Sequence, residues 1–167
     1  MQDSSGHKDK DMSLYLDSAL VEDARAAFAY GFVGGITTNP SLLAKINRPE
    51  EEVIAELCEI AKGTVFYQLQ ADGPGARVAE GERMLGLVPN RVGLKIPCTR
   101  QNLQLAADFA AQGHVVGITA IFSPAQIYLA CEAGAHLHYE ESFLHALNSR
   151  CAGKGSVSYT HLTLPTN

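Results

Sequence analysis

The feature that most constrains the fold of this chain is a serial alternation of short apolar runs with helical patterns. Five strand-like runs recur along the sequence, at 14–17, 34–38, 64–70, 92–97 and 114–119. Five helical patterns follow them in turn, at 21–30, 50–62, 76–87, 101–112 and 125–133. Strands and helices that alternate in this way form a parallel sheet covered by the helices. The sequence therefore predicts an α/β protein.

One lysine lies where a parallel sheet buries its strands. The stretch from Arg91 to Thr99 is an apolar run that carries Lys95 between Gly93 and Pro97. Apolar surroundings disfavour the ammonium form and lower the pKa of a lysine, which leaves more of the neutral amine that attacks carbonyl carbons. The alternative is that the side chain reaches water at the strand end or pairs with a carboxylate. On this stretch alone, both interpretations stay open.

Polar side chains follow the ends of all five predicted strands. They are Asp17, Thr37, Thr38, Asn39, Gln68, Gln70, Lys95 and Thr119. The carboxyl ends of parallel strands meet at one rim, and active sites form there in open sheets and in barrels. Each residue alone has an ordinary explanation, such as a helix cap, a turn or a hydrogen bond to the backbone. Their occurrence on five consecutive strands predicts a functional site at that rim.

Four motifs occur in a characteristic order. They read Leu-Tyr-Leu-Asp-Ser-Ala from position 14, Gly-Ile-Thr-Thr-Asn-Pro-Ser-Leu-Leu from 35, Gly-Leu-Lys-Ile-Pro from 93 and Gly-Ile-Thr-Ala from 117. In sequence and spacing they resemble the transaldolase family, and most closely its short fructose-6-phosphate aldolase branch. The resemblance covers 12–135 and implies a (βα) TIM-type barrel, of which about the first five βα units are present. It places Lys95 on the fourth strand, where the family carries its Schiff-base lysine.

The resemblance also implies a role for each matching residue. Lys95 would form an imine with a ketose phosphate so that the C3–C4 bond breaks or forms, and Asp17 would hold substrate hydroxyls and handle protons. Asn39, with Thr38 beside it, would bind the dihydroxyacetone portion of the sugar. Thr119 would belong to the group that handles water around the imine. The chemistry so implied is a class I aldolase reaction that needs neither a metal nor a cofactor.

Gln68 separates the two branches of that family. True transaldolases carry a glutamate as acid/base at this position, whereas the aldolase branch has a glutamine, which exchanges no proton and only positions water. The resemblance therefore favours a fructose-6-phosphate aldolase-like lyase, with a true transaldolase that transfers dihydroxyacetone as the alternative. A receiver-like signalling domain is a remote third interpretation. It would need paired acids near Asp17 and a lysine on the fifth strand.

Composition narrows the partners and the location. The net charge of −5 argues against a nucleic-acid partner or an anionic membrane surface, because either calls for a basic patch. No apolar run reaches the length of a membrane span, and the first eleven residues lack the apolar core of a secretory signal. The four cysteines show no C-x-x-C spacing, which is typical of reduced thiols. We expect a cytoplasmic protein that binds sugar phosphates, and the resemblance implies a homo-oligomer at full length.

The two ends of the chain depart from the family pattern. We expect 1–11 to be a polar leader of non-native origin, 136–156 a divergent tail, and 157–167 a scar like a translated sequencing adapter. The family's strand-six tyrosine falls near Tyr139 and Glu141, and neither residue is assigned its role. A metal site at His136, His138 and Glu140 is a minor alternative. Because the family's phosphate-binding residues lie later, we expect this chain to be inactive alone.

Overall fold

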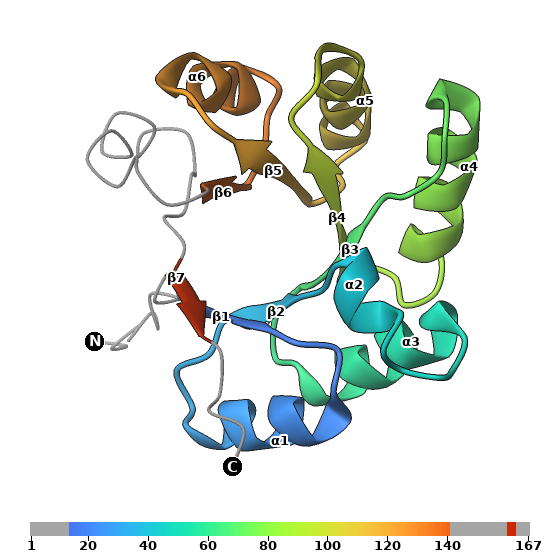
Figure 1. Ribbon diagram of the computed structural model, residues 1–167, viewed down its shortest axis with the longest axis vertical. Coiled ribbons are helices and arrows are strands. Elements are labelled where there is room, and N and C mark those ends of the chain that lie inside the picture. Colours follow the sequence, from blue (N-terminus) through green and yellow to red (C-terminus); the bar gives the residue numbers. More distant parts are fainter. Residues whose placement is uncertain (1–13, 141–159, 163–167) are drawn as a thin grey trace, which may run out of the picture.

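The computed structural model describes residues 14–140 and 160–162, and its core is one parallel sheet. The strands are β1 (Leu14–Asp17), β2 (Gly35–Thr37), β3 (Val65–Gln68), β4 (Val92–Pro97), β5 (Val116–Ile121), β6 (Leu137–Glu140) and β7 (Thr160–Leu162). They pair in the order β6-β5-β4-β3-β2-β1-β7, and each of these pairs is parallel. The sheet curls around a central axis in the manner of a partial (βα) barrel (Figure 1).

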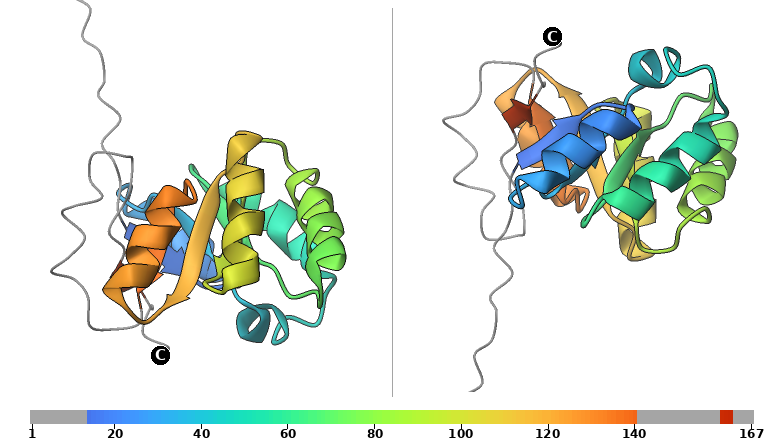
Figure 2. Two further views of the ribbon diagram at one scale, coloured as in Figure 1. Left: turned by 90° about the horizontal axis from the view of Figure 1, so that it is seen from above. Right: turned by 90° about the horizontal axis from the view of Figure 1, so that it is seen from below.

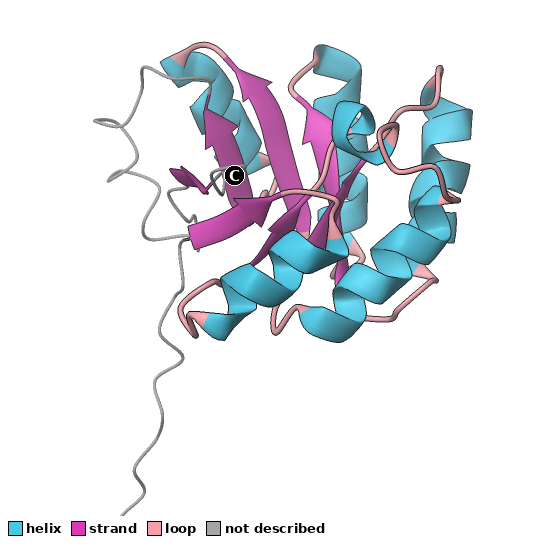
Figure 3. Ribbon diagram, turned by 60° about the horizontal axis from the view of Figure 1, so that its bottom comes forward, coloured by secondary structure: helices cyan, strands magenta, loops and turns pink. Residues whose placement is uncertain are grey.

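Within the described residues, six helices connect the strands and lie outside the curl. They are α1 (Val21–Ala29), α2 (Pro40–Leu43), α3 (Glu50–Ile60), α4 (Pro74–Leu85), α5 (Arg100–Ala111) and α6 (Pro124–Glu132). Figures 2 and 3 show α1, α3, α4, α5 and α6 packed side by side along the convex face of the sheet. The arc of helices begins at α1 and ends at α6 (Figure 1). The predicted five strand-helix units and the barrel-type architecture are confirmed.

The boundaries differ from the sequence-based ones in a few places. Helices α4 and α6 begin at Pro74 and Pro124, because proline suits the first helical turn, where its missing N–H costs nothing. The single turn of α2 was not predicted. Strand β5 runs two residues beyond Thr119, and a sixth strand follows it. The short β7 lies inside the segment expected to be an adapter-like scar, and the origin of that segment stays a prediction.

Alternation along the strands separates an apolar outer face from a mixed inner face. Leu16, Ile36, Leu94, Ile96 and Ile118 are fully buried and form the core together with the inward sides of the helices. Successive strand residues point to opposite faces, so Asp17, Thr37, Gln68 and Lys95 lie on the other side, within the curl. The apolar core thus lies between the sheet and the helices, and the polar residues lie on the concave side of the sheet, inside the curl.

A polar network fastens β3 to two helices on the outer face. The Tyr67 hydroxyl lies 2.8 Å from Glu50 Oε2 of α3 and 2.9 Å from Glu80 Oε1 of α4. Glu80 is buried and also accepts from the backbone N–H groups of Gln70 and Ala71. Burial, together with hydrogen bonds to the two carboxylates, raises the pKa of Tyr67. The network fixes the chain where it leaves β3.

Two further sequence expectations bear on the location of the protein. None of the helices in the described ranges combines the length and the apolar character needed to cross a membrane. Cys58 and Cys98 are free, as reduced thiols would be, whereas Cys131 is disulfide-bonded. The expectation of reduced cysteines therefore holds at two of these three positions.

Candidate active site

Lys95 lies near the end of β4, on the inner face of the sheet, with 4% of its surface exposed. Its register partners are Gln68 on β3 and Gly117 on β5. Gly117 contributes no side chain to the inner face beside the lysine. A side chain as long as lysine is seldom buried this deeply without a function or a partner.

Aromatic rings line the inner face one layer below the lysine. Tyr15 and Phe66 pack edge to face, with their ring centroids 5.9 Å apart. They rest against glycines: a Cβ added at Gly93 would lie 2.8 Å from Phe66 Cε1, and one added at Gly35 would overlap the Tyr15 ring. Glycine at these positions lets the two rings fill the interior of the curl. The inner face of the sheet therefore carries an apolar layer next to Lys95.

Burial and one nearby carboxylate act in opposite directions on Lys95. Desolvation lowers the pKa of Lys95 to about 8, while the negative charge of Asp17 opposes part of that shift. Asp17 ends β1 and accepts a hydrogen bond of 2.7 Å at Oδ1 from the hydroxyl of Thr37, which ends the neighbouring β2. Thr37 is one of the polar residues that the sequence places at the strand ends, and the family resemblance implied no role for it. Its full burial and its bond to Asp17 place it within the site.

Gln68 and Thr119 lie on the same inner face as the lysine. Gln68 is half-buried directly opposite Lys95 in the β3–β4 register. Thr119 on β5 pairs with Pro97, which is the next residue of β4 after Lys95 on the inner face. The Thr119 carbonyl accepts a hydrogen bond of 2.7 Å from the Cys98 N–H. The structure therefore brings Asp17, Gln68 and Thr119 to one rim with Lys95, as the sequence predicted.

The two residues that follow Thr37 lie differently. Asn39 is half-buried, and its Oδ1 accepts a hydrogen bond of 3.0 Å from Leu42 N, which caps α2 and leaves the amide nitrogen of the side chain available. Thr38 is fully buried on the face opposite Thr37, and its hydroxyl donates to the Phe66 carbonyl at 2.8 Å. Gln70 turns outward, and its side chain amide donates to Glu50.

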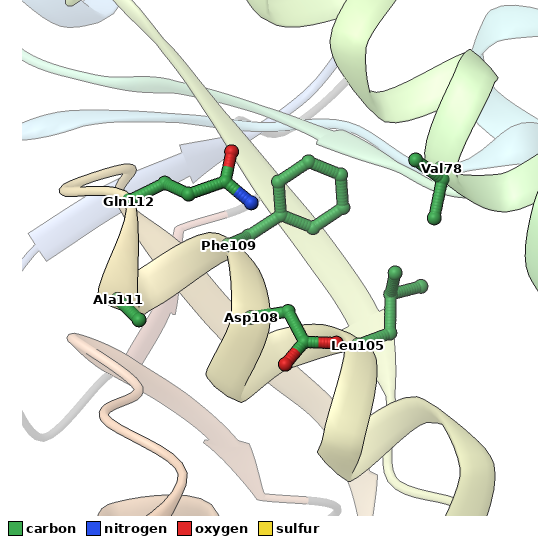
Figure 4. Close-up of a pocket in the computed structure, with 6 residues that line it drawn as sticks. All are labelled: Val78, Leu105, Asp108, Phe109, Ala111 and Gln112. Atoms are coloured by element: carbon green, nitrogen blue, oxygen red, sulfur yellow. The ribbon is translucent and has the colours of Figure 1, made fainter.

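Two other kinds of site, a metal centre and a surface hollow, come into question in the part of the chain that the structure describes. No cluster of three or more His, Cys, Asp or Glu residues there is arranged to hold a metal ion. The minor metal interpretation also needs the side chains of His138 and Glu140, and these two side chains lie outside the part that the structure describes. A hollow of about 410 Å³ opens between α4 and α5, on the helical exterior, and is lined mainly by apolar groups such as Val78, Leu105 and Phe109 (Figure 4).

Comparison with known proteins gives a consistent result. Residues 14–144 match a family model described as transaldolase/fructose-6-phosphate aldolase. A probable transaldolase from Caulobacter sp. (strain K31) is 42% identical over 124 residues, which are 74% of this chain and 57% of that protein. One from Phenylobacterium zucineum has the same values, and one from Desulfotalea psychrophila is 39% identical over 125 residues, 74% of this chain and 58% of that protein. The match spans less than three fifths of the length of each relative.

Proposed function

This chain belongs to the transaldolase/fructose-6-phosphate aldolase family, and from that premise we propose that the protein completed to family length is a class I, Schiff-base enzyme acting on ketose phosphates. The observation that carries the proposal is the burial of Lys95, which lowers its pKa to about 8. A neutral amine at neutral pH is what imine formation requires.

Several residues of the inner rim share the steps of the reaction. The Lys95 amine adds to the ketose carbonyl, and loss of water gives a protonated imine, which accepts the electron pair of the breaking C3–C4 bond. The C4 hydroxyl loses its proton as the aldehyde leaves. The resulting enamine takes up a proton, and water then releases the ketone and restores the amine. Asp17, held by Thr37, is suited to bind hydroxyls and accept protons, and Gln68 and Thr119 are suited to position water.

Asn39 and Thr38 support the site in different ways. The amide nitrogen of Asn39 remains a donor for the dihydroxyacetone portion, since its oxygen caps α2. Thr38 donates its hydroxyl to the Phe66 carbonyl of the neighbouring strand β3. We propose that this hydrogen bond fixes the position of the end of β2, where Thr37 and Asn39 project toward substrate.

Two reactions are compatible with this machinery. Gln68 supports cleavage of the kind catalysed by fructose-6-phosphate aldolases, because an amide at this position transfers no proton. The name probable transaldolase, carried by the relatives, supports the transfer of dihydroxyacetone instead. An enzyme of the first kind releases aldehyde from fructose 6-phosphate without an acceptor, and one of the second kind turns over only when an acceptor aldehyde is added.

Further expectations extend to partners and location. The net charge of −5 supports a small-molecule enzyme without nucleic-acid or membrane partners. We propose a cytoplasmic location, which the free Cys58 and Cys98 thiols favour and the Cys131 disulfide does not. A homo-oligomer at full length, and inactivity of this chain alone, remain predictions.

The decisive experiment traps the imine. This chain and a chimera, in which residues 12–135 are joined to the unmatched remainder of the Caulobacter relative, are treated with borohydride and dihydroxyacetone or fructose 6-phosphate. Peptide mass mapping should find the reduced adduct on Lys95 of the chimera, and Lys95→Met should abolish both adduct and turnover. Lys62→Met, which removes an exposed lysine, is the matched control. Full turnover with Lys95 unmodified would eliminate the mechanism.

A further inference from the structure

One buried polar side chain near the rim has no step in the proposed reaction. Asn102, in the first turn of α5, is 4% exposed, and an amide is seldom buried so deeply unless its hydrogen bonds are satisfied. Its Nδ2 donates to the Pro97 carbonyl at 2.9 Å, and its Oδ1 accepts from Arg77 Nη1 at 3.1 Å. The amide therefore joins the end of β4 to both α4 and α5.

Proline makes the end of β4 dependent on such a contact. The Lys95 carbonyl accepts a hydrogen bond of 3.0 Å from Leu69 N, on the β3 side of the strand. Pro97 has no N–H, so the hydrogen bonds of β4 to β3 cannot continue there as they do in an ordinary parallel pair. On the other side β4 keeps a hydrogen bond to β5. The Asn102 amide thus holds the strand where its bonding to β3 stops.

The backbone of the same residue holds the turn that follows the strand. Two residues, 98 and 99, separate β4 from α5. Thr99 caps the helix by accepting from Asn102 N at 3.3 Å, and its own N–H donates to the Pro97 carbonyl at 2.9 Å. Asn102 therefore fixes this turn through its side chain and its backbone, two residues after Lys95.

We propose that Asn102, anchored by Arg77, is a positioning residue for Lys95: its amide holds the end of β4 closed, so that water stays away from the lysine. The assignment rests on the proposed role of Lys95 as the nucleophile. Without the amide, the Pro97 carbonyl would lose a donor and take one from water, because a carbonyl short of hydrogen bonds is costly to bury. Water at the strand end would then solvate the ammonium group.

The direction of the effect follows from this solvation. Burial lowers the pKa of Lys95 to about 8, and contact with water should raise it toward the ordinary 10.5. Asp17 on β1 acts on the ammonium through its charge, whereas the neighbours in register, Gln68 on β3 and Gly117 on β5, carry none. A substitution at Asn102 leaves all these groups in place. A change in the pKa of Lys95 therefore reports water at the strand end.

Acylation of Lys95 tests the proposal on the full 167-residue chain. Its pH dependence is measured with a small excess of acetic anhydride and read by peptide mass spectrometry. Asn102→Leu replaces the amide by an apolar group of the same branched shape, and the midpoint should rise by about one pH unit, which is about tenfold less neutral amine at pH 7. Asn102→Gln keeps donor and acceptor and should restore most of the parent curve. Gln104→Leu removes an exposed amide of the same helix and should not move it.

A merely structural role gives a different result. It would lower the free energy of unfolding and leave the acylation midpoint in place, as expected for Leu105→Ala, which removes buried apolar contacts of α5. An unmoved midpoint in Asn102→Leu, or an equal rise in Leu105→Ala, would overturn the proposal.

Two safeguards keep these outcomes distinct. Circular dichroism at each pH shows whether the variants are folded. Should Asn102→Leu fail to fold, Asn102→Ser, whose hydroxyl ends one bond short of the amide nitrogen, takes its place with the same expected rise. Acylation needs no ketose, so failure of the imine chemistry and failure of this assignment are separate results.

Discussion

At Lys95, burial and an opposing charge act on the same ammonium group. A lysine with the ordinary pKa of 10.5 has about one neutral amine in three thousand at pH 7, whereas a pKa of about 8 leaves roughly one in ten. The gain in reactive amine is therefore several hundredfold. Burial of the side chain within the fold produces this gain without any chemical change in the lysine itself.

The same burial has a cost in stability that is measurable on this chain. Unfolded, Lys95 holds its proton up to about pH 10.5; folded, it loses the proton above about pH 8. Folding therefore releases a proton in this window, and stability rises with pH across it. Below pH 8 the lysine lowers the free energy of unfolding by on the order of 3 kcal/mol. Lys95→Met should recover much of this near pH 7, as measured by urea denaturation.

The control for this prediction is another lysine. Lys62→Met removes an exposed ammonium and should leave the free energy of unfolding nearly unchanged at both ends of the window. In Lys95→Met the stability gain should shrink as the pH approaches about 10.5. A gain of the same size at every pH would mean that packing alone, and no proton, explains it.

The negative charge of Asp17 should keep the pKa of Lys95 higher than burial alone would make it. This charge opposes the effect of desolvation on the ammonium, so Asp17→Asn should move the pKa of Lys95 further below about 8. The measurement is the pH dependence of Lys95 acylation by a small excess of acetic anhydride, read by peptide mass spectrometry. Asp72→Asn removes the same charge from an exposed turn and should not move the curve. An upward movement in Asp17→Asn would contradict the electrostatic account.

At the scale of elements, the end of β5 shows how the backbone presents Thr119. Between the pairs Ile118–His138 and Ile121–Glu140, β5 has two residues where β6 has one, so β5 contains a bulge. Ala120 lies in this bulge with φ 57°, in the left-handed region. Simple alternation from an inward Thr119 would also turn Ile121 inward. The extra residue restores Ile121 to the core, where it is fully buried.

The bulge predicts opposite effects for one substitution at two sites. Ala120→Gly should raise the free energy of unfolding by about 1 kcal/mol, because glycine tolerates positive φ, and Ala120→Val should lower it by more than that. Ala79→Gly, in the exposed middle of α4, should instead cost about 1 kcal/mol. Chemical denaturation of the three variants checks these signs. Destabilisation by Ala120→Gly comparable to that of Ala79→Gly would argue against the left-handed conformation.

These elements also show what sequence could reveal. The strand-helix series and the rim with Lys95, Asp17 and Gln68 were predictable, because apolar runs and strand ends are local patterns. Helix α2 was missed because a single turn, Pro40–Leu43, is too short to display helical periodicity. The bulge was missed because alanine, unlike glycine, gives no indication of positive φ. Because successive strand residues point to opposite faces of the sheet, one residue of the Thr37-Thr38 pair must point inward. Only the register with Asp17 identifies that residue as Thr37.

At the scale of the whole molecule, an open curled sheet differs from a closed barrel in how stability is distributed. In a closed barrel every strand has two neighbours, whereas in the described sheet β3 and β4 are paired on both sides and β6 and β7 form the ends. On the inner strands, Val65, Phe66, Leu94 and Ile96 are at most 1% exposed. Opening should therefore begin at the end strands, because each of them has a paired strand on one side only in the described order.

Hydrogen exchange on the intact chain should show this gradient. The amides of Val65 and Leu94, which donate to the Arg91 and Val115 carbonyls, should exchange only on global unfolding, and those of β6 much faster. Mass spectrometry of peptic peptides resolves the strands. Equal protection of β6 and β4 would contradict this gradient, because it would mean that the end of the described sheet opens no more easily than its middle.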